Sequence, residues 1–140
     1  MHVIFWSHTG NTEAMASAIA EGARGTGAAV ELKSVGDTDA RAALDCDLLA
    51  LGCPAMGDEV LEESEFEPFF TDLEGQLAGK KVALFGSYGW GDGQWMRDWC
   101  DRARSDGAVL FSEEGLICNG APDDDTQAAC RKLCADLAAW

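Results

Sequence analysis

Short apolar runs alternate along the chain with longer stretches in which apolar residues recur every three or four positions. The runs predict strands at residues 3–6, 30–32, 47–52 and 82–86, and a broken last strand at 109–111 and 116–118. The longer period predicts helices at residues 12–24, 66–77, 95–103 and 127–140. No linker or repeat divides the sequence, so residues 1–140 are expected to form a single domain.

Alternating strands and helices are typical of an α/β fold with a doubly wound parallel sheet and helices on both faces. Ligands of such sheets bind beyond the carboxyl ends of the strands, where the winding direction reverses. The functional site is therefore expected in the loops that follow the first, third and fourth strands.

The loop after the first strand has the composition of a phosphate site. Hydroxyl and amide side chains surround one glycine in the run Ser7, His8, Thr9, Gly10, Asn11 and Thr12. The following helix adds free N–H groups and a partial positive charge, which suit a phosphate monoester. The run contains no Lys or Arg and no G-x-G-x-x-G, so it is neither a Walker A loop nor a dinucleotide fingerprint. An ordinary helix N-cap is the alternative, but a cap needs only one such residue.

The loops after the third and fourth strands predict a flat aromatic ligand. They contain Pro54, Ala55, Met56, Gly57, Asp58 and Glu59, and Ser87, Tyr88, Gly89, Trp90 and Gly91. A Trp in a glycine-rich loop is suited to stacking, and Met offers a polarizable contact to the other ring face. Glu59 could accept a hydrogen bond from an imide N–H. A phosphate beside a planar heterocycle describes flavin mononucleotide (FMN).

These three loops, in this order, resemble those of the short-chain flavodoxins, and the resemblance covers essentially the whole chain. It implies a five-stranded parallel sheet in the order 2-1-3-4-5. It also implies non-covalently bound FMN that cycles between oxidised, semiquinone and hydroquinone states. The expected protein is a monomeric, low-potential one-electron carrier that replaces ferredoxin between redox enzymes. It is not itself an enzyme.

The resemblance also assigns roles to single residues. It implies that Ser7, Thr9, Asn11 and Thr12 hold the phosphate, with help from Ser87. Met56 and Trp90 should flank the ring, and Gly57, Asp58, Glu59 and Gly89 should hydrogen-bond to it, while Asn119 should reach the ribityl chain. Gly57, Asp58, Trp90 and Met56 should tune the redox potentials. His8 and Pro54 depart from the pattern, since His8 adds a titratable ring and Pro54 has no N–H.

The formal net charge of −15 argues against nucleic acid and anionic membrane surfaces as partners. It favours redox enzymes that carry basic docking surfaces around their redox centres. The flavin edge is expected to be ringed by Asp58, Glu59, Glu62, Glu63, Glu65 and Glu67, by Asp92, and by Asp123 to Asp125. A solvated acidic face without a docking role is the alternative.

Cysteine usage and the N-terminus indicate a cytoplasmic protein. The six cysteines form no C-x-x-C pair, and their spacing to the two histidines does not resemble a zinc site. They are expected to be buried thiols in a reducing compartment. The sequence shows neither a signal-peptide pattern at its start nor an apolar run of about 20 residues, the length needed to span a membrane.

Two other classes share this topology. A flavin-dependent NAD(P)H:quinone-type reductase would need a further pocket, usually built from extra loops or an oligomer, and no such insertion is present. A phosphoryl-transfer or receiver domain would need acidic residues where Trp6–Ser7 and Cys53–Pro54 stand, and a cysteine phosphatase would need an Arg shortly after Cys53.

Overall fold

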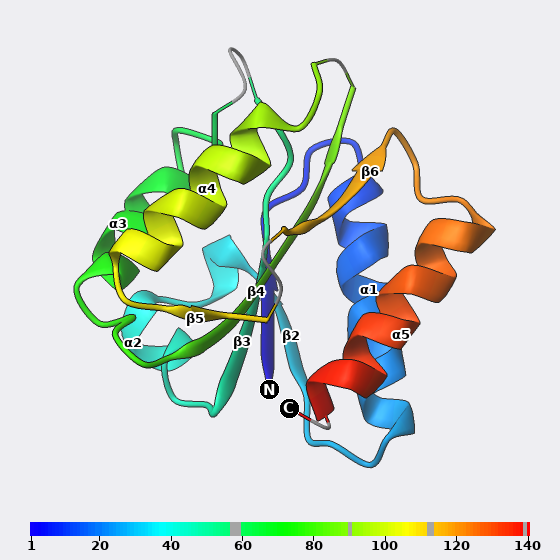
Figure 1. Cartoon of the computed structure of the whole chain (residues 1–140), viewed down its shortest axis with the longest axis horizontal. Coiled ribbons are helices and arrows are strands. Elements are labelled where there is room, and N and C mark those ends of the chain that lie inside the picture. The colour runs from blue at the N-terminus through cyan, green and yellow to red at the C-terminus, as the bar shows by residue number, and fades with distance from the viewer. Residues whose placement is uncertain (57–59, 90, 112–113, 139) are drawn as a thin grey trace.

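A central parallel sheet lies between two layers of helices in the computed structural model (Figure 1). The structure describes residues 1–56, 60–89, 91–111, 114–138 and 140. The predictions for Gly57, Asp58, Glu59 and Trp90 lie outside these residues.

The strands are β1 (His2–Phe5), β2 (Glu31–Ser34), β3 (Leu48–Gly52), β4 (Lys81–Tyr88), β5 (Val109–Leu110) and β6 (Leu116–Asn119). The sheet follows the order β2-β1-β3-β4-β5, with every pair of these strands parallel, which confirms the predicted order. The last sheet position is shared by two short strands, as the interrupted apolar pattern predicted. The first pairs with the beginning of β4 and the second with its end.

Helices cover both faces of the sheet, as the alternating pattern predicted. Those on one face are α1 (Asn11–Gly25) and α5 (Asp124–Ala138), and those on the other are α2 (Ala40–Ala43), α3 (Phe66–Glu74) and α4 (Gln94–Ser105) (Figure 1). The sequence pattern missed α2 and the 3₁₀ turn Val35–Asp37, because segments this short show no helical period. It also placed the start of α5 three residues late, since Asp123 caps this helix by accepting a hydrogen bond from the Thr126 N–H at 2.8 Å.

The two faces carry two separate apolar cores. The core under α3 and α4 is aromatic, and the buried Trp99 ring packs edge-to-face with Phe66 and Phe70 at centroid distances of 5.4 and 5.9 Å. The core between α1, α5 and the sheet is built from smaller residues such as Met15, Ile19 and the thiols of α5. None of the helices among the described residues is long and apolar enough to cross a membrane.

An ionic cluster joins α3 to α4 on the outer surface. Arg102 donates to both carboxylate oxygens of Glu67, at 2.9 and 2.8 Å, and also binds Glu74. The hydrogen bond from Arg102 lowers the pKa of Glu74. Burial, together with the neighbouring Glu74 carboxylate, raises the pKa of Asp106 to about 6. The two neighbouring carboxyl groups therefore ionise in separate pH ranges.

The raised pKa of Asp106 predicts that the free energy of unfolding depends on pH. Its folded-state pKa lies above that of an unfolded Asp, so its contribution is complete below about pH 4 and is lost as the pH rises through about 6. In Asp106→Asn this loss should disappear. The variant should gain roughly 1 kcal/mol or less relative to the parent between pH 4 and 7, because Asp106 is only partly buried and solvent screens its carboxylate. Urea denaturation across this range measures the gain, and a pH-independent difference would contradict the assignment.

Candidate cofactor site

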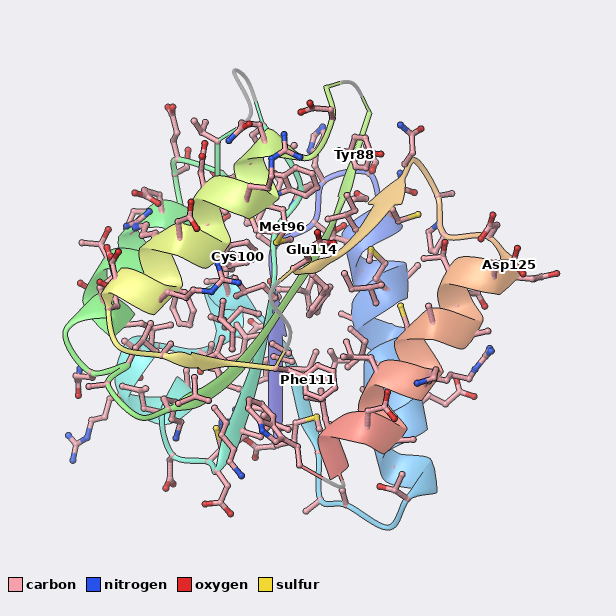
Figure 2. All side chains as sticks on the ribbon, in the orientation of Figure 1. Tyr88, Met96, Cys100, Phe111, Glu114 and Asp125 are labelled. Atoms are coloured by element: carbon pink, nitrogen blue, oxygen red, sulfur yellow. The ribbon has the colours of Figure 1, made fainter. Side chains whose placement is uncertain are left out.

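The predicted site loops meet at one edge of the molecule. The segments that follow β1, β3 and β4 lie together at the carboxyl edge of the sheet, beside the end of β6 (Figure 1). Tyr88 lies at the end of β4 on this edge (Figure 2). The structure therefore brings together the described residues of all three predicted loops.

The loop after β1 is shaped by Ser7 and Gly10. The Ser7 Oγ accepts hydrogen bonds from the N–H groups of Gly10 and Glu13, at 3.1 and 3.3 Å. Gly10 caps α1 with a φ of 92°, a conformation that glycine adopts without strain. A Cβ at Gly10 would meet no atom within 4 Å, so the glycine leaves an open approach to the helix end.

The start of α1 retains unused hydrogen-bond donors. A helix leaves its first N–H groups without intrahelical partners, and Ser7 satisfies two of them here. Among the described residues no partner is found for the N–H groups of Asn11 and Thr12. Because the Ser7 oxygen uses both lone pairs as an acceptor, its hydroxyl hydrogen also stays available.

A buried hydroxyl pair joins this loop to β4. The Thr12 Oγ1 lies 3.2 Å from the Ser87 Oγ and accepts from the Ser87 N–H at 3.4 Å. Both residues are almost completely buried, at 1% and 5% exposure. Only one hydroxyl can donate to the other, so the pair always retains one hydrogen for a ligand. The sequence suggested Thr12 and Ser87 separately but did not reveal this contact, because 75 residues separate them.

His8 and Thr9 are exposed at the rim of the loop. The His8 ring stacks on Trp6, with centroids 6.1 Å apart and planes inclined by 11°. The Trp6 Nε1–H points toward Glu65 Oε1 at 3.4 Å. The side chain that departs from the family pattern thus has an aromatic neighbour on this surface.

The described ends of the loop after β3 pair as the two arms of a hairpin. Met56 and Val60 exchange two backbone hydrogen bonds of 2.9 Å each, and Ala55 donates to the Ser87 carbonyl at 3.0 Å. Pro54 and Ala55 are half-buried, as is Met56. Backbone hydrogen bonds therefore join the two ends of this loop to each other and its start to the end of β4.

The described residues of the loop after β4 are not all exposed. Tyr88 is half-buried and packs against the buried Trp95 ring at a centroid distance of 5.5 Å. Tyr88 therefore packs partly against the core of this face, because α4 brings Trp95 next to it. Gly89 and Gly91 are exposed, and Asn119 ends β6 in register with Tyr88.

Glu62 does not belong to the acidic rim, contrary to the sequence-based expectation. It is 5% exposed, and its carboxylate accepts hydrogen bonds from the N–H groups of Ser64, Glu65 and Phe66 at 2.6–2.8 Å. Burial opposes its ionisation, but these hydrogen bonds outweigh that effect and lower its pKa. The glutamate run therefore mixes an internal cap at the start of α3 with surface charges.

Two further acids of the predicted rim are paired with arginines. Glu67 binds Arg102, and Asp92 binds Arg97 at 2.8 Å. Glu63 and Glu65 remain exposed beside the hairpin, and Asp125 lies at the exposed start of α5 (Figure 2). The negative rim of the described site is consequently narrower than the sequence predicted.

The described donors fit the phosphate end of FMN. Two helix N–H groups and at least two hydroxyl hydrogens remain available around Gly10, and no Lys or Arg stands in residues 7–12. Neutral donors and the helix dipole can hold a phosphate monoester in this way. FMN, when bound, supplies a ring that accepts and releases electrons one at a time.

Comparison with known proteins identifies the family. Residues 3–133 match the family model described as "Flavodoxin". A flavodoxin of Clostridium beijerinckii is 52% identical over 91% of both chains, and one of Megasphaera elsdenii is 47% identical over 95% of this chain and 94% of its own. The solution structure of two-electron reduced Megasphaera elsdenii flavodoxin superposes with a TM-score of 0.86 at 43% identity, covering 99% of this chain and 98% of that one.

The chain belongs to the flavodoxin family. Flavodoxins are FMN-binding electron-transfer proteins and not enzymes, so this chain is an FMN-dependent electron carrier. Its length of 140 residues is that of a short-chain member. The relatives do not favour the quinone-reductase alternative.

Proposed function

We propose that the site at the carboxyl edge of the sheet binds one FMN, and that the holoprotein works as a low-potential carrier between redox enzymes in place of ferredoxin. The observation that supports this most directly is the set of free donors at the start of α1, which lies next to the hairpin after β3. Ser7, Thr9, Asn11 and Thr12 bind the phosphate, and Ser87 assists. Met56 contacts the ring, and Asn119 faces the ribityl chain.

The surroundings of the site disfavour additional negative charge. The phosphate of FMN carries roughly −2 near neutral pH. Glu63 and Glu65 stand exposed beside the hairpin, and residues 7–12, 54–59 and 87–93 contain no Lys or Arg. A fully reduced, anionic ring is therefore less stable here than in water, which makes the second electron strongly reducing.

The exposed charges favour a partner with a basic surface. With a net charge of −15, the protein attracts a positively charged redox enzyme. The exposed Glu63 and Glu65 place negative charge beside the cofactor edge, which favours docking there. The contact need only be small and transient, as is usual for electron-transfer encounters. Six free cysteines support a reducing, cytoplasmic compartment, and the protein acts as a monomer.

Electron transfer to a basic acceptor protein tests this docking surface. Changing Glu63 and Glu65 together to Gln should slow the second-order rate about 3- to 10-fold at low salt, within the range of electrostatic steering. The matched control is Asp45→Asn with Asp47→Asn, which removes the same charge at the opposite edge of the sheet. Stopped-flow rates across a salt series should converge at high ionic strength. Equal rates for both double variants would assign docking to another surface.

A further inference from the structure

A surface hollow of about 280 Å³ lies where α3, α4 and the Val60 arm of the hairpin after β3 meet. The two helices lie side by side on one face of the sheet (Figure 1). The floor of the hollow is apolar, since it is lined by the buried residues Leu61, Trp95 and Trp99. Val60 lines it too, with 43% of its surface exposed. This space, called the α3–α4 hollow below, therefore presents apolar surface to solvent.

The α3–α4 hollow adjoins the cofactor site on two sides. Val60 exchanges two backbone hydrogen bonds of 2.9 Å with Met56. The Trp95 ring packs against Tyr88, which lies at the carboxyl edge of the sheet (Figure 2). Met56 and Tyr88 both belong to loops of the cofactor site. A protein that inserted a side chain into the hollow would therefore come to rest beside the cofactor edge.

The rim of the α3–α4 hollow is acidic. Glu63, Glu67 and Asp98 line it together with a single cation, Arg102. Arg102 binds both carboxylate oxygens of Glu67. Glu63 and Asp98 form no ion pair among the residues that the structure describes, and Asp98 accepts one hydrogen bond from the Gln94 amide at 2.8 Å. Two carboxylates of the rim thus keep acceptor capacity for an incoming cation.

An apolar floor below unpaired carboxylates is complementary to a long basic side chain. The methylene stem of Lys or Arg packs on apolar surface while its charged head stays among polar groups. The volume of about 280 Å³ falls just below the range of roughly 300–1,000 Å³ that is usual for small-molecule pockets. The chemistry and size of the hollow therefore suit one side chain delivered by another protein.

We infer that the α3–α4 hollow receives a lysine or arginine side chain of the redox partner. The inference rests on the proposed docking of a basic partner and adds a contact that fixes its orientation. Long-range attraction by Glu63 and Glu65 speeds the encounter, but many orientations satisfy it almost equally. A side chain seated in a hollow allows few orientations, and such anchors carry a large share of the binding energy at protein interfaces.

Asp98→Trp tests the inference by placing a bulky ring at the hollow. It should lower the second-order rate of electron transfer from the reduced holoprotein to a lysine-rich haem protein about 5- to 10-fold, the effect of losing one anchor contact. The loss should persist at high ionic strength, because the block is steric and salt screens only charge. Asp72→Trp is the matched control, since it makes the same change at an exposed position of α3 outside the hollow. It should stay within about twofold of the parent.

Chemical-shift mapping of the parent holoprotein supplies a second readout that needs no variant. Adding a redox-inactive form of the same haem protein should shift the indole N–H signals of Trp95 and Trp99 and the amide signals of Val60 and Asp98. The Asp72 amide should not move. The Trp99 Nε1–H is buried and has no partner among the described residues, so its signal responds directly to a change in the hollow. Acetylation of the lysines of the haem protein should abolish these shifts.

Equal rates for Asp98→Trp and Asp72→Trp, or shifts confined to Glu63 and Glu65, would overturn the inference and leave docking by charge intact. A parent rate that does not fall as salt is added would instead overturn the proposed docking surface. Failure of the apoprotein to bind FMN would overturn the proposed cofactor site. The three results are independent, so each assigns the failure to one claim.

Discussion

Riboflavin should bind the apoprotein at least about 100-fold more weakly than FMN. The two ligands differ only in the phosphate, which meets the free N–H groups of Asn11 and Thr12 and the hydroxyl hydrogens of the loop. A hydrogen bond to a charged group contributes about 1.5–3 kcal/mol, so two of them account for the difference. Fluorescence titration of apoprotein with each ligand measures both dissociation constants.

The Thr12 hydroxyl allows the same claim to be tested by substitution. Thr12→Val should weaken FMN about 10- to 100-fold and riboflavin much less, because the valine cannot donate to the phosphate. Thr26→Val is the matched control at the opposite end of α1, where the hydroxyl donates to the Ala23 carbonyl. The control should leave both affinities unchanged. Equal affinities for FMN and riboflavin in the parent protein would exclude a phosphate site at this loop.

Glu62→Gln should lower the free energy of unfolding by about 2–4 kcal/mol, the cost of disrupting a buried, charge-assisted cap. The neutral amide has one acceptor oxygen in place of two, and its NH₂ group would face the N–H groups that now donate to Glu62. Chemical denaturation of the apoprotein at neutral pH measures the loss. The depressed pKa of Glu62 also makes the contribution of this residue decline as the pH falls through its folded-state value.

Glu63→Gln is the appropriate comparison, since it makes the same chemical change at the next position, where the side chain is exposed. It should change stability by less than about 0.5 kcal/mol, as exposed substitutions usually do. Similar losses for the two variants would mean that Glu62 acts as a surface charge, as its place in the acidic run first suggested.

The strands and the polar loop after β1 could be predicted because local pattern determines them. The unbroken apolar run of β3 is buried on both faces, and Gly10, the one glycine of the polar loop after β1, leaves the open approach expected of it. The division of the last strand between β5 and β6 was likewise visible, because charged and glycine residues interrupt its apolar run.

The contacts that hold the site loops in place could not be predicted, because they join residues far apart in the chain. Nothing local distinguishes Glu62 from its exposed neighbours, and it is buried where the segment before α3 contacts Cys53. The Thr12–Ser87 pair and the indole bond from Trp95 to Cys53 span 75 and 42 residues. Sequence periodicity places Trp95 on a helix face but cannot show where its N–H points.

Stepwise reduction of the FMN-loaded protein, followed by its visible spectrum, tests the central claim most directly. The account predicts two separate one-electron steps, with a blue one-electron-reduced form that accumulates near half reduction. The second midpoint potential should lie well below that of free FMN, because the acidic rim and the phosphate oppose the added charge. A single two-electron step at a potential close to that of free FMN would contradict the assignment of this site to one-electron transfer.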